Sequence, residues 1–408
     1  MTPMTTTPLV QDDTGPALAR ALAGRAAGQQ PQWPDRERVR EVRAALGALP
    51  PLVRPAAVDR LRERLAEAAL GRALVVQGGD CAETFAGNTA EHVRSNLHAL
   101  LHCATLFEVA SGLPVVPVGR VAGQYAKPRS SPVGPDGLPA YRGDIVNGQA
   151  ATAGARTPDP ERMLTAYAGA GEALGVLESV AAATRTELFA GHEALLLDYE
   201  VPLVRDGYGL SGHFLWIGER TRELDGAHVA LARRIANPLG LKLGPGTTPE
   251  QAVAYAEALD PDRVPGRLTL ISRMGADRVA DVLPPLVEAV TAAGHPVVWL
   301  CDPMHGNTEV AASGLKTRRF ERIAAEVTGY FAVHRALGTH PGGLHLELTG
   351  DDVTECLGGR EELREEQLPE RYLTGCDPRL NGRQTVDLAR IVAEILLERP
   401  ARRAPVAV

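Results

Sequence analysis

The stretch that decides the fold runs from Ala73 to Phe85 and has the sequence ALVVQGGDCAETF. Its first four residues form a continuous apolar run, which is typical of a strand buried on both faces. Gly78 and Gly79 end that run at a point where the backbone passes close to other groups. We therefore predict a buried strand at 73–76 with Cys81 just beyond its carboxyl end.

Seven similar apolar runs follow, and helical stretches separate them. The predicted strands are 73–76, 115–118, 188–191, 214–217, 239–243, 268–271, 297–300 and 344–348. The predicted helices of this region are 90–111, 162–184, 224–237, 249–259, 276–293, 318–337 and 385–397. Apolar strands joined by helices favour a parallel sheet covered on both faces. Eight such units predict an α/β fold of the (β/α)8 TIM barrel type.

The segment before the first strand contains two amphipathic stretches, at 36–46 and 56–70, which predict helices that cover one end of the barrel. The predicted organisation is a flexible tail at 1–16, N-terminal helices packing on the barrel at 17–72, and a catalytic barrel with its C-terminal helix at 73–408.

Composition excludes several classes of partner. The chain has 408 residues, 44% of them hydrophobic, and a net charge of −7, so neither nucleic acid nor a membrane surface is expected as a partner. The five cysteines show no disulfide framework, and the N-terminus has no basic, apolar signal pattern. We expect a reducing, cytoplasmic location.

Four residues could bind a divalent metal. Cys81 lies at a strand end, and the later part of the chain supplies His305, Glu347 and Asp377 in the segments DPMHGN, LHLE and CDP. A thiolate, an imidazole and two carboxylates form a ligand set of mixed softness. The alternatives are that Cys81 and Cys376 form a disulfide or are idle thiols, and that His305 caps its loop or supports another ligand.

Each predicted strand is followed by a charged or hydrogen-bonding side chain. The cationic ones are Arg120, Lys127, Arg129, Arg220, Lys242 and Arg273. Since the carboxyl ends of barrel strands share one face, these cations would repel one another unless an anion neutralised them. Arginine binds phosphate and carboxylate in bidentate fashion, so we expect a ligand with several negative charges.

The chain resembles the type II 3-deoxy-D-arabino-heptulosonate 7-phosphate (DAHP) synthases over nearly its whole length. The matching motifs are 77–85, 123–130 (GQYAKPRS), 141–148 (YRGDIVNG), 213–220 (HFLWIGER), 241–245, 301–308 (CDPMHGNT), 343–350 and 376–381. The resemblance implies a transferase, 3-deoxy-7-phosphoheptulonate synthase, which condenses phosphoenolpyruvate with erythrose 4-phosphate in the first step of the shikimate pathway.

The resemblance also implies residue roles. It gives Cys81, His305, Glu347 and Asp377 as ligands of Mn²⁺ or Co²⁺, and Lys127, Arg120 and His305 as catalytic residues. The implied substrate-binding residues are Arg120, Lys127, Pro128, Arg129, Ser130, Glu193, Glu219, Arg220, Lys242 and Arg273. A homodimer is expected.

Two alternative functions stay open: the same chemistry on an amino analogue of erythrose 4-phosphate, and a non-catalytic metabolite-binding relative. Longer family members carry extra helices between Gly148 and Glu193, where this chain has room for little more than 162–184. That departure concerns regulation, and it would suit a role in secondary metabolism.

Overall fold

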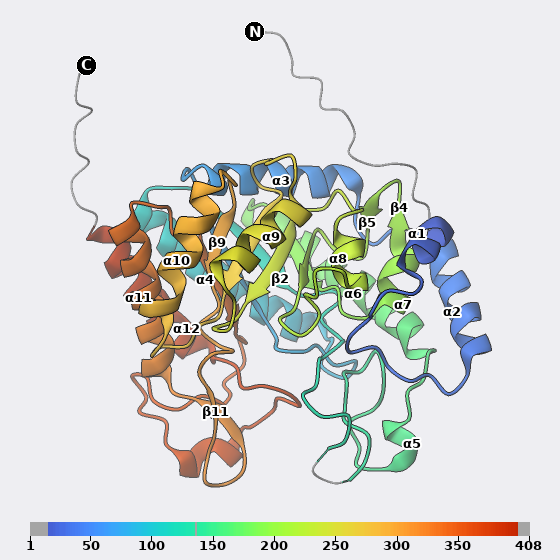
Figure 1. Ribbon diagram of the computed structural model, residues 1–408. Helices are drawn as coiled ribbons and strands as arrows, with labels where there is room; N and C mark the ends of the chain where they lie inside the picture. The colour runs from blue at the N-terminus through green and yellow to red at the C-terminus, as the bar shows by residue number, and fades with distance from the viewer. Residues whose placement is uncertain (1–14, 135–136, 399–408) are drawn as a thin grey trace.

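The apolar runs form a closed barrel of parallel strands in the computed structural model, which describes residues 15–134 and 137–398 (Figure 1). In chain order the barrel strands are β1 (Leu74–Gly79), β2 (Val115–Arg120), β3 (Phe189–Glu193), β6 (Phe214–Ile217), β7 (Leu239–Leu243), β8 (Leu268–Ser272), β9 (Val298–Cys301) and β12 (Gly343–Glu347). Each strand neighbours the next in chain order, and β12 closes the barrel against β1. The predicted (β/α)8 fold is confirmed.

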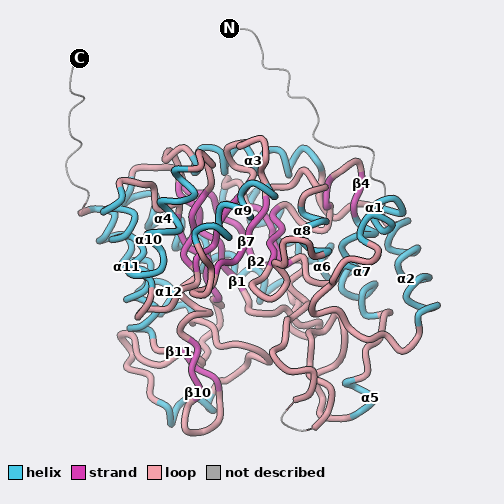
Figure 2. The backbone as a smooth tube through the Cα atoms, in the orientation of Figure 1, coloured by secondary structure: helices cyan, strands magenta, loops and turns pink. Residues whose placement is uncertain are grey.

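Helices surround the barrel on its outside (Figure 2). The helices after β1 are α4 (Ala90–Ser111), α5 (Ala153–Arg156), α6 (Arg162–Thr184), α7 (Leu197–Glu200), α8 (Ala227–Ala232), α9 (Pro249–Leu259), α10 (Val279–Ala292), α11 (Phe320–Leu337) and α12 (Gly382–Leu397). The exception is α5, which lies among the loops at one end of the barrel. Thr248 and Gln251 form a capping box at the start of α9, which fixes where that helix begins.

One end of the barrel is closed by α3 (Pro55–Ala69), which lies across it (Figure 1). Leu61 and Leu65 of this helix are buried with Val75, Phe214 and other residues that point inward near the starts of the strands. Alternate residues of a strand share a face, so Gln77 follows Val75 on the inner face of β1, and the interior changes from apolar at this end to polar further along. The amino ends of the strands therefore form a packed floor.

Two further helices, α1 (Gly15–Leu22) and α2 (Arg36–Ala48), precede α3 and pack on the barrel side. The predicted tail at 1–16 falls mostly outside the described residues, and α1 begins at Gly15. None of the described helices combines the length and apolarity needed to cross a bilayer.

The opposite end carries the long connections. The hairpin β10 (Thr308–Val310) and β11 (Lys316–Arg318), the helix α5 and the 3-10 helix η2 (Glu365–Glu370) belong to them, and Figure 2 shows the hairpin and α5 on the side away from α3. A smaller hairpin, β4 (Val204–Arg205) with β5 (Tyr208–Gly209), follows the 3-10 helix η1 (Val201–Leu203). The carboxyl ends of the barrel strands open among the long loops.

Three helices are shorter than the sequence predicts, and one of them, expected at 276–293, is observed as Val279–Ala292. The helix expected at 224–237 is limited to Ala227–Ala232, because the Asn237 amide pairs with the backbone of Gly209 at 2.8 Å instead of continuing a helix. The helix expected from residue 318 begins at Phe320, since Arg318 pairs with Thr308 in the β10–β11 hairpin.

Candidate active site

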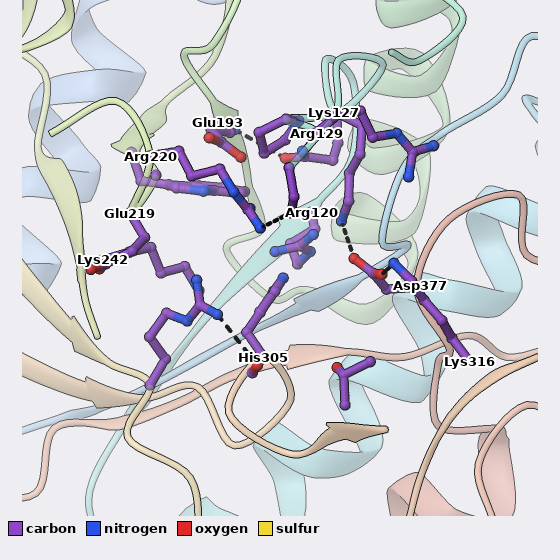
Figure 3. A pocket seen from close by; sticks show the side chains of 17 residues that line it. Arg120, Lys127, Arg129, Glu193, Glu219, Arg220, Lys242, His305, Lys316 and Asp377 are labelled. Atoms are coloured by element: carbon purple, nitrogen blue, oxygen red, sulfur yellow. Dashed lines mark hydrogen bonds and ion pairs between the residues drawn. The ribbon is translucent and has the colours of Figure 1, made fainter. Parts of the chain in front are cut away.

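A polar cavity of about 200 Å³ opens at the carboxyl ends of the strands (Figure 3). All of the predicted substrate-binding residues line it, and so do His305 and Asp377. The lining is Arg120, Gln124, Lys127, Pro128, Arg129, Ser130, Glu193, Trp216, Gly218, Glu219, Arg220, Lys242, Arg273, His305, Thr308, Lys316 and Asp377. Segments more than 200 residues apart in sequence thus meet in one place because parallel strands end at one face.

Three of the four predicted metal ligands meet beside this cavity. Cys81, Glu347 and Asp377 each offer a ligand atom, and these atoms lie within 4.8 Å of one another. His305 stands next to this group, with its Nε2 atom 3.3 Å from Glu347 Oε1. Cys81 and Glu347 are fully buried and do not line the cavity, so Asp377 is the member of this group that faces it.

Two lysines neutralise this acidic group. Lys127 Nζ lies 2.7 Å from Cys81 Sγ, 2.9 Å from Asp377 Oδ2 and 3.6 Å from Glu347 Oε1. Lys316, from the β10–β11 hairpin, reaches the other oxygen of Asp377 at 2.8 Å, as Figure 3 shows. The three potential ligands are thus already gathered around one positive charge.

Asp302 orients two of the site's side chains. Its Oδ2 atom lies 2.7 Å from His305 Nδ1 and also pairs with the Lys242 ammonium. A carboxylate at Nδ1 leaves Nε2 of the ring facing Glu347, which is the arrangement usual for metal-binding histidines. Below them the fully buried Arg318 forms an ion pair with Glu347 at 2.7 Å.

Burial and charge shift several pKa values. Burial raises the pKa of the Cys81 thiol well above its usual range, and a hydrogen bond to Cys376 and the charge of Glu347 add to this. Burial alone would raise the pKa of Asp377, but Lys127 holds it well below its usual range. Burial lowers the pKa of Lys242 to about 8, although Asp302 opposes this. Lys242 can therefore change its protonation near neutral pH.

The remaining cations face the cavity with part of their hydrogen-bonding capacity open. Arg220 donates to Ser130 Oγ at 2.9 Å, and Arg273 donates to the His305 carbonyl at 3.3 Å. The buried Nε of Arg273 has no hydrogen-bond partner among the described residues. Such a cluster of guanidinium and ammonium groups is built to bind an anion.

Buried carboxylates fix the loops that carry these side chains. Glu83, on the loop after Cys81, accepts hydrogen bonds from the backbone N–H groups of residues 122–124 at 2.7–2.9 Å, just before Lys127. Glu355 accepts from the backbone of Thr374 at 2.8 Å and Arg379 at 2.8 Å, on either side of Asp377. The site is thus preorganised by interactions outside the cavity.

Sequence reasoning missed three residues of this region. These are Lys316 and Thr308, which line the cavity, and Arg318, which supports Glu347, and all three belong to a hairpin that the strand pattern did not reveal. Three further lining residues, Gln124, Trp216 and Gly218, were given no role although they lie within the matching motifs. The alternation of Lys316, Thr317 and Arg318 on a short strand could have suggested two side chains on one face, but nothing local indicates that this face meets the site.

The chain matches the model of the class-II DAHP synthetase family at residues 19–184 and 171–393. It is 46% identical over 449 aligned positions to phospho-2-dehydro-3-deoxyheptonate aldolase AroG of Mycolicibacterium smegmatis, covering 95% of this chain and 96% of that protein. It is 47% identical over 444 positions to phospho-2-dehydro-3-deoxyheptonate aldolase of Streptomyces coelicolor, covering 95% of this chain and 99% of that protein.

A solved structure, that of phospho-2-dehydro-3-deoxyheptonate aldolase from Francisella tularensis, covers 88% of this chain and 97% of its own with a TM-score of 0.51. At 14% sequence identity this likeness concerns the fold. The 449 positions aligned with the Mycolicibacterium protein are 41 more than the chain has residues, so that relative carries internal segments that this chain lacks.

Proposed function

This chain belongs to the class-II DAHP synthetase family, and on that premise we propose that it condenses phosphoenolpyruvate with erythrose 4-phosphate to DAHP and inorganic phosphate. This is the first step of the shikimate pathway. The observation that carries the proposal is the cavity in which the predicted cations lie beside Cys81, Glu347 and Asp377. Both substrates are anions, and phosphoenolpyruvate carries a phosphate and a carboxylate.

The donor set suits a divalent metal. Cys81, Glu347 and Asp377 form a compact group, and His305 adds an imidazole whose Nδ1 atom is already engaged by Asp302. We propose these four residues as the ligands and Mn²⁺ or Co²⁺ as the native ion. A bound divalent ion supplies Lewis-acid polarisation of a carbonyl oxygen and favours loss of the Cys81 proton.

The cations of the cavity bind and orient the two substrates. Arg120, Arg220, Lys242 and Arg273, with Glu219 beside them, form the proposed phosphoenolpyruvate subsite, and Lys127, Pro128, Arg129, Ser130 and Glu193 the aldose phosphate subsite. With both substrates held in these subsites, C3 of phosphoenolpyruvate forms a bond to the aldehyde carbon of the aldose. Water adds at C2, and phosphate leaves with cleavage of its C–O bond. Fixed positive charges stabilise the charge that shifts during these steps.

Lys127, Arg120 and His305 are the residues proposed to contact the reacting groups. Lys127 and Arg120 are buried at the inner end of the cavity, where Lys127 is surrounded by the proposed ligands. In that position an ammonium can donate a proton or a hydrogen bond to an oxygen that gains negative charge.

The test is an assay of phosphoenolpyruvate consumption over a panel of aldose phosphates, in which the ultraviolet absorbance of phosphoenolpyruvate is monitored. Each aldose is assayed with Mn²⁺, Co²⁺ or Mg²⁺, and with a chelator. We expect depletion with erythrose 4-phosphate and a divalent ion, equimolar phosphate release, and loss of the reaction with chelator. A clear preference for a four-carbon amino or imino analogue would change the assigned aldose. No depletion with any aldose or metal would refute the enzymatic function.

Family resemblance also supports a homodimer as the working assembly. Light scattering on the purified protein measures this directly, with a mass near twice the 43.3 kDa of one chain expected. The mass of a monomer at assay concentrations would refute the proposed homodimer without affecting the assigned chemistry.

A further inference from the structure

Glu326 is a fully buried carboxylate on α11 that does not line the cavity. Its Oε1 atom accepts hydrogen bonds from the backbone N–H of Met274 at 2.8 Å and of Gly275 at 2.9 Å. Its Oε2 atom accepts from Asn307 Nδ2 at 2.7 Å. One side chain thus holds two loops, the one after β8 and the one after β9.

These loops carry two residues of the proposed site. Met274 directly follows Arg273, and Asn307 lies two residues after His305. Asn307 completes the connection, since its Oδ1 atom accepts from the Ala276 N–H at 3.1 Å and its Nδ2 atom donates to the Pro303 carbonyl at 2.8 Å. The two loops are thereby joined through one amide and one carboxylate.

The backbones of the two loops are in direct contact. A Cβ atom on Gly306 would lie 2.4 Å from the Gly275 backbone nitrogen, and Gly275 itself has a φ of +88°. Arg273 crosses the same gap to reach the His305 carbonyl at 3.3 Å. A small shift of either loop would therefore move Arg273 relative to His305.

Packing alone does not account for a carboxylate at this position. Neighbouring buried residues of α11, such as Ile323 and Val327, are apolar, and burial raises the pKa of Glu326 to about 7. A buried carboxylate is retained at a cost, and that cost is offset by its hydrogen bonds. The three groups that hydrogen-bond to Glu326 are all donors, so both of its oxygens must act as acceptors.

We propose that Glu326 is a positioning residue that fixes Arg273 and His305 relative to each other by holding the β8 and β9 loops, and so sets the affinity for both metal and phosphoenolpyruvate. This inference rests on the proposed function, because it takes Arg273 as a substrate-binding residue and His305 as a metal ligand. Glu326 acts through Met274, Gly275 and Asn307, and it touches neither substrate nor metal.

The test exploits the donor pattern. In Glu326→Gln the amide oxygen can still accept from Met274 and Gly275, but the NH₂ group faces the NH₂ of Asn307. Turning the Asn307 amide over would only set its NH₂ against the Ala276 N–H. Adding Asn307→Asp restores the bonds to position 326 and to Ala276, since a carboxylate at position 307 accepts from both the new amide and the Ala276 N–H. It gives up the donor to the Pro303 carbonyl. The double variant thus exchanges the carboxylate and the amide between positions 326 and 307.

We measure binding of Mn²⁺ alone by titration calorimetry, KM and kcat for phosphoenolpyruvate, and Tm. For Glu326→Gln we expect at least tenfold weaker Mn²⁺ binding and a KM at least tenfold higher. We expect the double variant to recover part of both losses, because the Pro303 carbonyl stays without its donor. The control is Asp260→Asn, which alters a carboxylate that accepts from Val264 N–H at 2.9 Å between α9 and β8, and should change Tm alone.

Wild-type Mn²⁺ affinity and KM in Glu326→Gln, with or without a lower Tm, would overturn the inference. If Glu326→Gln does not fold, Asn307→Ser, which removes the bond to Glu326 Oε2 together with those to Ala276 and Pro303, must show the same two losses. A wild-type protein that binds neither Mn²⁺ nor phosphoenolpyruvate would instead refute the proposed function.

Discussion

The ammonium of Lys127 lies 2.7 Å from the sulfur of Cys81, at the centre of the proposed metal ligands. Asp377 Oδ2 at 2.9 Å and Glu347 Oε1 at 3.6 Å complete its surroundings. Burial alone would lower the pKa of Lys127, but the charges of Asp377, Cys81 and Glu347 raise it, so Lys127 stays protonated. The two carboxylates and the Cys81 sulfur thus surround an ammonium in this state and would bind a divalent ion in another.

This arrangement predicts opposite effects of Lys127→Met on metal binding and on catalysis. Removing a competing positive charge should strengthen Mn²⁺ binding, by about tenfold for roughly 1.4 kcal/mol of repulsion removed. The rate should fall by on the order of 10² to 10³, because an oriented cation at the reacting groups is lost. Calorimetry and the phosphoenolpyruvate assay measure the two effects. Weaker Mn²⁺ binding in this variant would contradict the competition.

Lys316→Met is the matched control for that prediction. Lys316 contacts the other oxygen of Asp377 from the cavity mouth, where its side chain is 44% exposed, so solvent already screens its charge. We expect Mn²⁺ binding to change less than in Lys127→Met. An equal gain in Mn²⁺ affinity in both variants would mean that the position of Lys127 among the ligands has no special effect, and that any positive charge near Asp377 weakens metal binding equally.

Cys81→Ser should remove metal binding while leaving the barrel folded. A serine hydroxyl is a far poorer ligand at neutral pH than a thiolate, and we expect a loss of about 100-fold or more in Mn²⁺ affinity, with activity falling in parallel. Metal content after dialysis measures metal binding, and far-ultraviolet circular dichroism measures whether the barrel is folded. Cys103→Ser, which changes a buried cysteine on α4 outside the cavity, serves as control. Normal metal content in Cys81→Ser would refute the ligand assignment.

The barrel could be predicted from sequence because its signal is local. The apolar run at Leu239–Leu243 and the helical pattern at Arg162–Thr184 match the observed β7 and α6 to the residue. The strand ends then indicated the site, since a parallel barrel brings them to one face.

What the sequence did not predict depends on contacts between distant segments. Arg318 was expected in a helix, but its pairing with Thr308 places it on β11, where it meets Glu347. Glu326 was expected only as part of the helix at 318–337, and the donors that explain it lie on two other loops. Local patterns carry no information about such partners.

Acid should destabilise the protein through His213. The Nδ1 atom of this buried ring accepts a hydrogen bond from the Ala190 N–H at 3.0 Å, so the folded state requires the neutral imidazole. Burial lowers the pKa of His213 to about 4. Between that value and an unfolded pKa of about 6.5 the unfolded state binds more protons, so stability falls as pH falls.

The measurement is chemical denaturation of the wild type and His213→Gln at several pH values. From pH 7 to pH 5 the wild type should lose on the order of 2 kcal/mol through this group, and the variant should lose less, because glutamine does not titrate. The quantity compared is the slope of the unfolding free energy with pH, which does not depend on the starting stability of the variant at pH 7. Equal slopes would show that His213 does not contribute.

The last prediction is that phenylalanine, tyrosine and tryptophan inhibit this enzyme poorly. Feedback inhibition needs a second site whose ligand binds two conformations unequally.

The two ranges of this chain that match the family model overlap at residues 171–184, inside α6, and the alignment with the Mycolicibacterium protein is longer than this chain. We therefore infer that segments present in such relatives are missing from this chain at the crossover between β2 and β3. Between Gly148 and β3, the structure has α5 and α6 as its helices, and α6 packs on α4 and α2.

The measurement is the initial rate with each of the three amino acids alone and in all pairs, at 1 mM, which is roughly the upper range of ordinary KM values. We expect the initial rate to change by less than about twofold in every case. Strong inhibition by any of them below that concentration would show that an effector site exists elsewhere on the barrel.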